Sequence, residues 1–258
     1  MIIDITSANN ANIKHIKALS SRKERRKYKE YTVEGIKSVN EAMKSGKEIV
    51  SLVISDDFDE ALINSDFEKI YRVPGFVFEK ICDTETPQGI LAVLKQDENE
   101  ISELEEGGLY LYCDGISDPG NMGTLIRTAE AAGFSGVLCS KNCVELYNPK
   151  TVRASMGSFF RMSVYEVDFL RLSEFKNNGA SLFGGALCDD TKDYREVEYN
   201  NTIVIIVGNE ANGISDEVLS VCTPVKIPIY GGAESLNAAV AAGILMYEAA
   251  NRRKMNKI

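Results

Sequence analysis

Polar side chains with possible catalytic roles gather in the loops of the second half of the chain. In chain order they are Asn121, Arg127, Glu210, Ser235 and Asn237. An arginine can grip a phosphate with two parallel hydrogen bonds, and a carboxylate can accept hydrogen bonds from amides. The single histidine, His15, lies near the N-terminus, which excludes a histidine base in this half. Sequence patterns for dinucleotide loops, P-loops, zinc proteases and serine hydrolases are also missing.

Strands and helices around these loops must position the candidate groups. The unbroken apolar run Ile203–Val207 predicts a strand buried on both faces, and Leu109–Asp114 and Val225–Ile227 predict two more. One helix is predicted over Thr124–Ala132. A longer helix is predicted over Ser235–Ala250, with its first residue as the N-cap. Each loop thus leaves a strand and leads into a helix, which is where open α/β sheets bind ligands.

Each candidate residue also has an ordinary structural interpretation. Asn121 can satisfy turn amides after a proline, Arg127 can be a surface helix residue, and Ser235 can simply cap its helix. The order of three motifs is more specific than any one residue. Asp118–Gly123 followed by Arg127, then Gly208–Glu210, then Ser235–Asn237 resemble the motifs of the SpoU (TrmH-like) RNA ribose 2′-O-methyltransferases. The resemblance covers essentially the whole chain, with Ala-Ala after Ser-Leu-Asn where many relatives have Val-Ser.

The resemblance implies transfer of a methyl group from S-adenosylmethionine to a ribose 2′-hydroxyl of RNA, with 23S ribosomal RNA as the first candidate and no metal. Arg127 is expected to clamp an RNA phosphate. Its guanidinium stays protonated near neutral pH and therefore cannot accept a proton as a simple base would. Asn121 is expected to bind near the 2′-hydroxyl and orient Arg127, and Glu210 to tether Arg127 or accept from an amide. Ser235 and Asn237 are expected to shape their loop.

The cofactor contacts implied by the resemblance are mostly backbone groups. By position they fall at Gly208, Asn209, Ile227 and Leu236. The implied architecture is a mostly parallel sheet with helices on both faces and a C-terminal trefoil knot. Members of the family are homodimers with the site near the interface, so a homodimer is expected.

Charge is unevenly distributed along the chain. The formal net charge of −9 is unusual for a general nucleic-acid binder. Residues 14–29 are nevertheless strongly basic, while acidic residues concentrate elsewhere. We expect the N-terminal part of the chain to contact RNA, at Arg22, Lys23, Arg25, Arg26 and Glu34. A solvated helical face is the alternative interpretation.

Helical and strand patterns alternate over the first part of the chain, which predicts a small α/β domain over residues 1–95. Glu34-Gly35 and Thr86–Gly89 make it similar to the L30e-like substrate-binding domain of larger SpoU proteins. The acidic stretch 96–108 predicts a linker, and residues 109–258 the methyltransferase domain.

Six scattered cysteines, no signal pattern and no membrane-length apolar run favour a cytoplasmic protein with reduced thiols, without a membrane or metal partner. Three alternatives remain open: a tRNA ribose methyltransferase, a non-catalytic RNA-binding protein on the same scaffold, and another small-molecule α/β enzyme.

Overall fold

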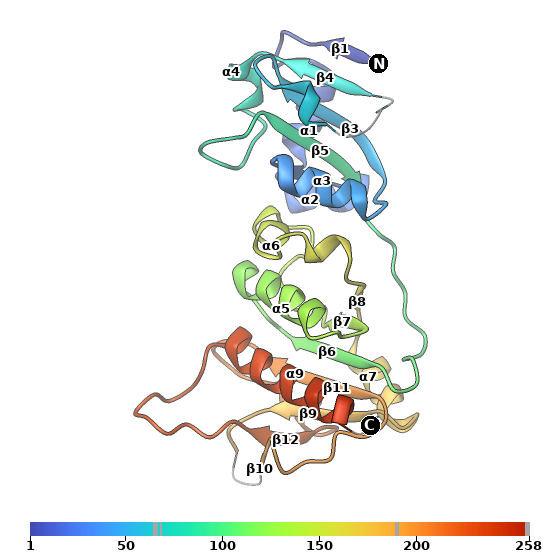
Figure 1. Ribbon diagram of the computed structural model, residues 1–258, viewed down its shortest axis with the longest axis vertical. Coiled ribbons are helices and arrows are strands. Elements are labelled where there is room, and N and C mark those ends of the chain that lie inside the picture. The colour runs from blue at the N-terminus through green and yellow to red at the C-terminus, as the bar shows by residue number, and fades with distance from the viewer. Residues whose placement is uncertain (64–66, 68, 189–190, 256–258) are drawn as a thin grey trace. The chain divides into compact units, whose positions relative to one another are not determined.

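The structure, a computed structural model, describes residues 1–63, 67, 69–188 and 191–255 (Figure 1). The chain forms two compact units. The first comprises Met1–Glu98 and Tyr147–Phe160, and the second comprises Asn99–Leu146 and Arg161–Ile258. Residues 147–160 therefore group with the first unit although they follow part of the second in sequence and fall inside the single domain predicted over residues 109–258.

The first unit is built on a five-stranded sheet in the order β1-β4-β3-β5-β2. The strands are β1 (Ile2–Asp4), β2 (Glu30–Glu34), β3 (Ile49–Ser55), β4 (Ile70–Val73) and β5 (Ile90–Lys95). The helices are α1 (Ala11–Ala18), α2 (Arg22–Tyr28), α3 (Ile36–Lys44), α4 (Gly75–Phe78) and α6 (Pro149–Ala154), with short 3₁₀ turns at Glu60–Leu62 and Ser158–Phe160. Ile13, Ile16 and Leu19 pack with Val53 and Leu91 in one apolar core.

The second unit is a seven-stranded sheet in the order β10-β12-β9-β11-β6-β7-β8, and all of its described strand pairs are parallel. The strands are β6 (Leu109–Asp114), β7 (Gly136–Cys139), β8 (Val164–Glu166), β9 (Ser181–Gly185), β10 (Lys192–Asp193), β11 (Ile203–Gly208) and β12 (Thr223–Lys226). The helices are α5 (Pro119–Ala131), α7 (Phe169–Asn177), α8 (Asp216–Leu219) and α9 (Ala238–Met255).

Helices cover both faces of this sheet, which explains why β11 is apolar at every position. Tyr110 and Val204 point to the face where Leu172 of α7 and Val218 of α8 are buried. On the other face α5 and α9 lie side by side (Figure 1). The predicted α/β class and the mostly parallel sheet are confirmed. None of the described helices is long and apolar enough to cross a membrane.

Candidate active site

Two neighbouring strands bring the first two motif loops to one edge of the second sheet. In the parallel pair β6 and β11, Asp114 lies opposite Gly208, so the loops after both strands leave the sheet together. The Asp114 carboxylate also accepts a hydrogen bond from Ser215 N, 2.8 Å away, just beyond the second loop. The two loops are therefore held together at their bases.

Asn121 joins all three motifs through its side chain. Its Nδ2 donates to Glu210 Oε1 at 2.9 Å, and its Oδ1 accepts from Asn237 Nδ2 at 3.1 Å. These residues are separated by 89 and 116 positions in sequence. Three motifs recognised separately in the sequence thus form one hydrogen-bonded cluster at the ends of β6, β11 and α9.

Glu210 holds the turn in front of α5. Its Oε2 accepts from the Ser117 backbone N at 3.2 Å and from the Ser117 hydroxyl at 2.9 Å, and its Oε1 accepts from Asp118 N at 3.3 Å. Partial burial alone would raise the pKa of Glu210. Hydrogen bonds from Asn121, from its own backbone amide and from Ser117 outweigh this effect and lower the pKa to about 2.

We expect Glu210→Gln to lower the stability of the second unit at neutral pH. Because the folded pKa is depressed below the ordinary value of 4.5, the carboxylate contributes stability above pH 4.5, and this contribution disappears as the pH falls through about 2. Glu210 is exposed, so solvent screening limits the effect to about 1 kcal/mol. Thermal unfolding between pH 7 and pH 2 should show a difference in unfolding temperature between the wild type and the variant, and this gap should shrink as the pH falls. A gap independent of pH, or equal to that of the exposed control Glu106→Gln, would contradict the assignment.

The helices that flank the cluster begin at residues other than those predicted. Helix α5 starts at Pro119 instead of Thr124, because the Asp118 side chain caps it by accepting from Asn121 N at 2.7 Å. Helix α9 starts at Ala238, and its cap is Asn237, whose Oδ1 accepts from Ala239 N and Val240 N. The prediction that Ser235 caps this helix is therefore wrong, and Ser235 lies in the exposed loop before it.

Arg127 lies apart from the Asn121 cluster. It is six residues further along α5, which is roughly 9 Å along the helix axis. Its side chain is exposed, and no hydrogen bond or ion pair joins it to another residue within the described ranges. Asn121 and Glu210 thus bind each other rather than orienting or tethering Arg127 as the sequence suggested. The guanidinium is left available for a ligand.

Sequence reasoning missed Ser117 as part of this site, and it placed Asp118 in the first motif without assigning it as the cap of α5. Asp118-Pro119 is a recognisable helix-start pair, so its capping role was accessible from the sequence. The contact between Ser117 and Glu210 spans 93 positions and leaves no local signal.

Comparisons with known proteins agree with this geometry. The SpoU rRNA methylase family matches residues 108–247, and an MRM3-like substrate-binding domain matches residues 10–92. The chain belongs to the SpoU family.

Two similar proteins cover nearly the same length. A 23S rRNA (guanosine(2553)-2′-O)-methyltransferase, RlmP of Bacillus subtilis, is 36% identical over 220 residues, covering 83% of this chain and 86% of that protein. The AdoMet-bound rRNA methyltransferase of Sinorhizobium meliloti has a TM-score of 0.88 at 30% identity, covering 97% and 98% of the two chains. This SpoU protein is accordingly an S-adenosylmethionine-dependent RNA ribose 2′-O-methyltransferase.

The loop between β12 and α9 suits the S-adenosylmethionine that SpoU enzymes use. None of the backbone N–H groups of residues 229–236 donates to another residue that the structure describes, so they are free to meet a ligand. Ile227 is half-buried at the start of this loop and Leu236 is 38% exposed near its end. These two predicted residues can contribute apolar contacts, while the backbone supplies hydrogen bonds.

Gly208 and Asn209 shape the neighbouring loop from inside. The Asn209 side chain accepts from Ala211 N and Asn212 N and donates to Gly115 O at 2.8 Å. Gly208 is buried at the end of β11, where an added Cβ would lie 2.1 Å from the Gly213 carbonyl carbon. Both residues build the loop, and backbone atoms are what it presents to a cofactor.

The predicted RNA-binding residues of α2 divide into an exposed group and a buried arginine. Arg22, Lys23 and Arg26 are exposed on α2. Arg25 is buried, and its Nη1 donates to the carbonyls of Leu19 and Ser20 at 2.8 and 2.7 Å. We therefore correct the set by removing Arg25, which serves the fold by closing the C-terminal end of α1.

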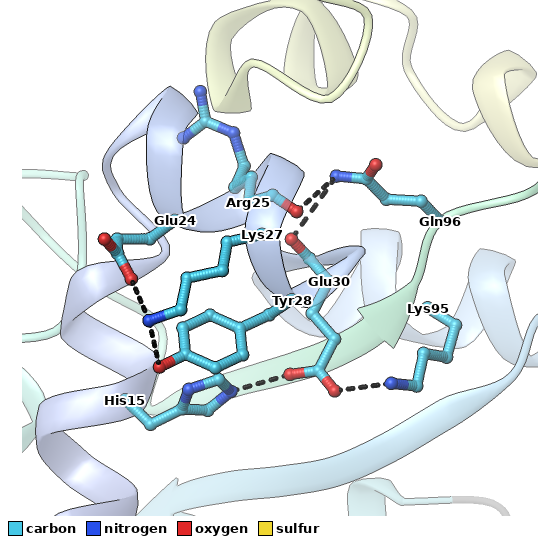
Figure 2. Close-up of polar contacts among 8 residues, drawn as sticks. All are labelled: His15, Glu24, Arg25, Lys27, Tyr28, Glu30, Lys95 and Gln96. Carbon is cyan, nitrogen blue, oxygen red and sulfur yellow. Dashed lines mark hydrogen bonds and ion pairs between the residues drawn. The ribbon is translucent and has the colours of Figure 1, made fainter.

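Other charged residues near α2 form pairs with one another. Figure 2 shows Lys27 between Glu24 and the Tyr28 hydroxyl, at 3.6 and 3.1 Å. It also shows Glu30 between His15 Nε2 and Lys95 Nζ, at 2.6 and 2.8 Å. The single histidine thus has a structural partner within its own unit.

Glu34 does not offer a free carboxylate to RNA. Its oxygens accept from Asp83 N at 2.6 Å, from Thr84 N at 3.3 Å and from the Thr84 hydroxyl at 2.8 Å. The predicted RNA contact by Glu34 is therefore replaced by a role in fixing the loop before β5.

Proposed function

We propose that this protein methylates a ribose 2′-hydroxyl of 23S ribosomal RNA. The observation that carries the proposal is the Asn121 bridge, which assembles the three SpoU motifs into one site. Support for the RNA class comes from the names of the Bacillus subtilis and Sinorhizobium meliloti proteins. Arg127 is exposed and has no partner among the residues that the structure describes, which favours an active enzyme over a non-catalytic RNA-binding scaffold.

The direct test is transfer of labelled methyl groups from S-adenosylmethionine to RNA from cells that lack the gene. We expect 23S ribosomal RNA to be labelled at a ribose, with 2′-O-methyl mapping showing one position lost in the deletion strain. Labelling of tRNA alone would support the tRNA alternative instead. Absence of transfer to any RNA by protein that binds the cofactor would favour the scaffold alternative.

The chain's own groups supply positioning and charge stabilisation in this reaction. S-adenosylmethionine would supply a methyl group activated by a positively charged sulfonium sulfur, which leaves as a neutral sulfide. Arg127 holds an RNA phosphate and lowers the cost of negative charge on the ribose oxygen, through a forked pair of hydrogen bonds. Asn121 keeps one N–H and one lone pair beyond its two described bonds, and these can meet the ribose. The proton leaves to the phosphate or to water.

We further propose a homodimer formed through the outer face of α5 and α9. Val240 and Tyr247, seven residues apart on one side of α9, are 54% and 47% exposed. Arg127 is exposed on the neighbouring helix, so a second copy there would lie beside the site. The free state of all six cysteines supports action in the cytoplasm. The trefoil knot implied by the resemblance stays a prediction.

The exposed basic residues of α2 should contribute RNA affinity rather than chemistry. We expect the triple variant Arg22→Ala, Lys23→Ala, Arg26→Ala to weaken RNA binding and to reduce its dependence on salt, because fewer counterions are released. Cofactor affinity should not change. Filter binding at several salt concentrations measures the RNA affinity and its dependence on salt.

A useful comparison is Arg25→Ala, which removes one positive charge of the same helix from a buried position. It should lower the unfolding temperature of the first unit by leaving carbonyls of the α1 end unpaired. Unchanged RNA affinity and salt slope in the triple variant would mean that this surface is only solvated.

A further inference from the structure

A cavity of about 350 Å³ lies within the first unit. Its walls come from three places in the chain: the start of α3 at Lys37, the loop before β5 at Pro87 and Gln88, and the segment after β7 at Arg153 and Met156. The volume is at the small end of the roughly 300–1,000 Å³ typical of small-ligand pockets. It is large enough for one flat ring system with its substituents and too small for a nucleic-acid duplex.

The walls combine apolar surface with available hydrogen-bond donors. Pro87, Ile90 and Met156 give apolar contact. Lys37 and Arg153 also line the cavity, and neither forms a hydrogen bond or ion pair with a residue in the described part of the chain. Two cations beside an apolar wall suit a ligand that has a flat ring and a negative charge, although Arg153 also interacts electrostatically with the Asp83 carboxylate.

The acidic groups of the cavity are already engaged. Glu34 accepts the three hydrogen bonds from Asp83 and Thr84 described above. Glu41 Oε1 lies 3.8 Å from Lys44 Nζ. Gln88 uses its Oε1 to accept from Ile36 N at 3.0 Å, which leaves its Nε2 as a donor. The groups left for a ligand are thus predominantly donors.

Met156 has a conformation that packing alone does not explain. Its φ is +52°, in the left-handed region that favours glycine, and its side chain is 51% exposed. The neighbouring Gly157 has a φ of +93°. A strained backbone that presents an apolar side chain at the edge of a cavity is typical of a binding site.

We propose that this cavity holds one unpaired nucleotide of the RNA substrate, with its base against Pro87 and Met156 and its phosphate on Lys37 and Arg153. RNA-binding proteins commonly take unstacked bases onto flat or apolar side chains and arginine, and read their edges with amides such as that of Gln88. The proposal rests on the proposed RNA substrate. It makes residues 153–157, which follow β7 in the chain, part of substrate recognition.

Two variants test the cavity, and a third serves as their control. Met156→Gly removes the apolar wall while placing glycine where the backbone favours it, so the fold should be retained or stabilised. Arg153→Ala removes the cation. Lys150→Ala removes an equal charge from an exposed position of the same helix that does not line the cavity.

The readout is the affinity for two probes, a 23S ribosomal RNA transcript and a plain RNA duplex. We expect Met156→Gly and Arg153→Ala to bind the transcript about tenfold more weakly than Lys150→Ala does, and the duplex equally well. Equal transcript affinity in all three variants would overturn the proposal. So would competition by free mononucleotides at micromolar concentration, which would point to a free nucleotide as the ligand.

This result is separable from the test of the proposed function because it measures binding, not transfer. A wild-type protein that transfers no methyl group to 23S ribosomal RNA would reject the proposed substrate. Transcript with 4-thiouridine at unpaired positions should in addition cross-link to the peptide that contains Met156, and a cross-link confined to other peptides would reject the cavity.

Discussion

Arg127→Lys should be almost as inactive in methyl transfer as Arg127→Ala. Lysine keeps the charge but loses the planar fork that grips a phosphate through two parallel hydrogen bonds. Loss of one oriented transition-state contact typically lowers the rate by about 10²–10³. The position favours such a role, because Arg127 is exposed on α5 and unpaired among the residues that the structure describes. Single-turnover transfer to 23S ribosomal RNA at saturating cofactor measures the effect.

The fold should not change in either Arg127 variant, because the Arg127 side chain forms no hydrogen bond or ion pair with a described residue that could be lost. Arg171→Lys is a suitable control, since Arg171 is an exposed arginine of α7 whose side chain pairs with Glu174 at 2.7 Å and donates to Ser102 O at 3.4 Å, outside the Asn121 cluster. It should transfer methyl groups at the wild-type rate. Cofactor affinity should stay constant in every Arg127 variant. Near-normal transfer by Arg127→Ala would remove this residue from the mechanism.

The parts of the site that the sequence predicted are those with local signatures. The unbroken apolar run Ile203–Val207 predicted β11 to within one residue of its observed end at Gly208. Burial on both faces removes the usual alternation of apolar and polar residues, which makes such a run recognisable. Asp118-Pro119 marks the true start of α5, but the glycines after it masked the helix. Ser235 and Asn237 are both good caps, and only the contact of Asn237 with Asn121 selects the second.

The parts that the sequence could not predict depend on tertiary contacts. Arg25 is one of six basic residues between Arg22 and Lys29 that look alike in sequence, yet it alone among Arg22, Arg25 and Arg26 is buried. Arg25 turns inward because its guanidinium donates to the carbonyls of Leu19 and Ser20 at the end of α1. The grouping of residues 147–160 with the first unit depends on aromatic packing of Tyr31 with Tyr147 and Phe159, with ring centroids 4.7 and 6.2 Å apart. No periodicity within one segment reports such contacts.

Gly208→Ala should weaken cofactor binding by about tenfold to a hundredfold. The family resemblance places Gly208 among the backbone contacts of the cofactor, so an added side chain could have met the ligand directly. The structure gives a different cause: the new Cβ would lie 2.1 Å from Gly213 C and 2.2 Å from Ile214 N, so the turn over the end of β11 must move. Overpacking of this kind costs roughly 1–3 kcal/mol, and every 1.4 kcal/mol is a factor of ten in affinity.

That displacement would propagate because the turn is tied at several points. Asn209 and Gly213 exchange two backbone hydrogen bonds of 2.9 Å each, and the Asn209 side chain reaches Gly115 O. Moving the turn therefore disturbs both loops at the ends of β6 and β11, including the position of Glu210.

Calorimetry of S-adenosylmethionine binding measures the loss of cofactor affinity in Gly208→Ala. Gly75→Ala, where an added Cβ meets nothing within 4 Å, is the control for a glycine change without a clash. RNA affinity should persist in Gly208→Ala, because α2 and the cavity belong to the first unit. Wild-type cofactor affinity in Gly208→Ala would show that the turn can yield without cost and that its close packing is unrelated to binding.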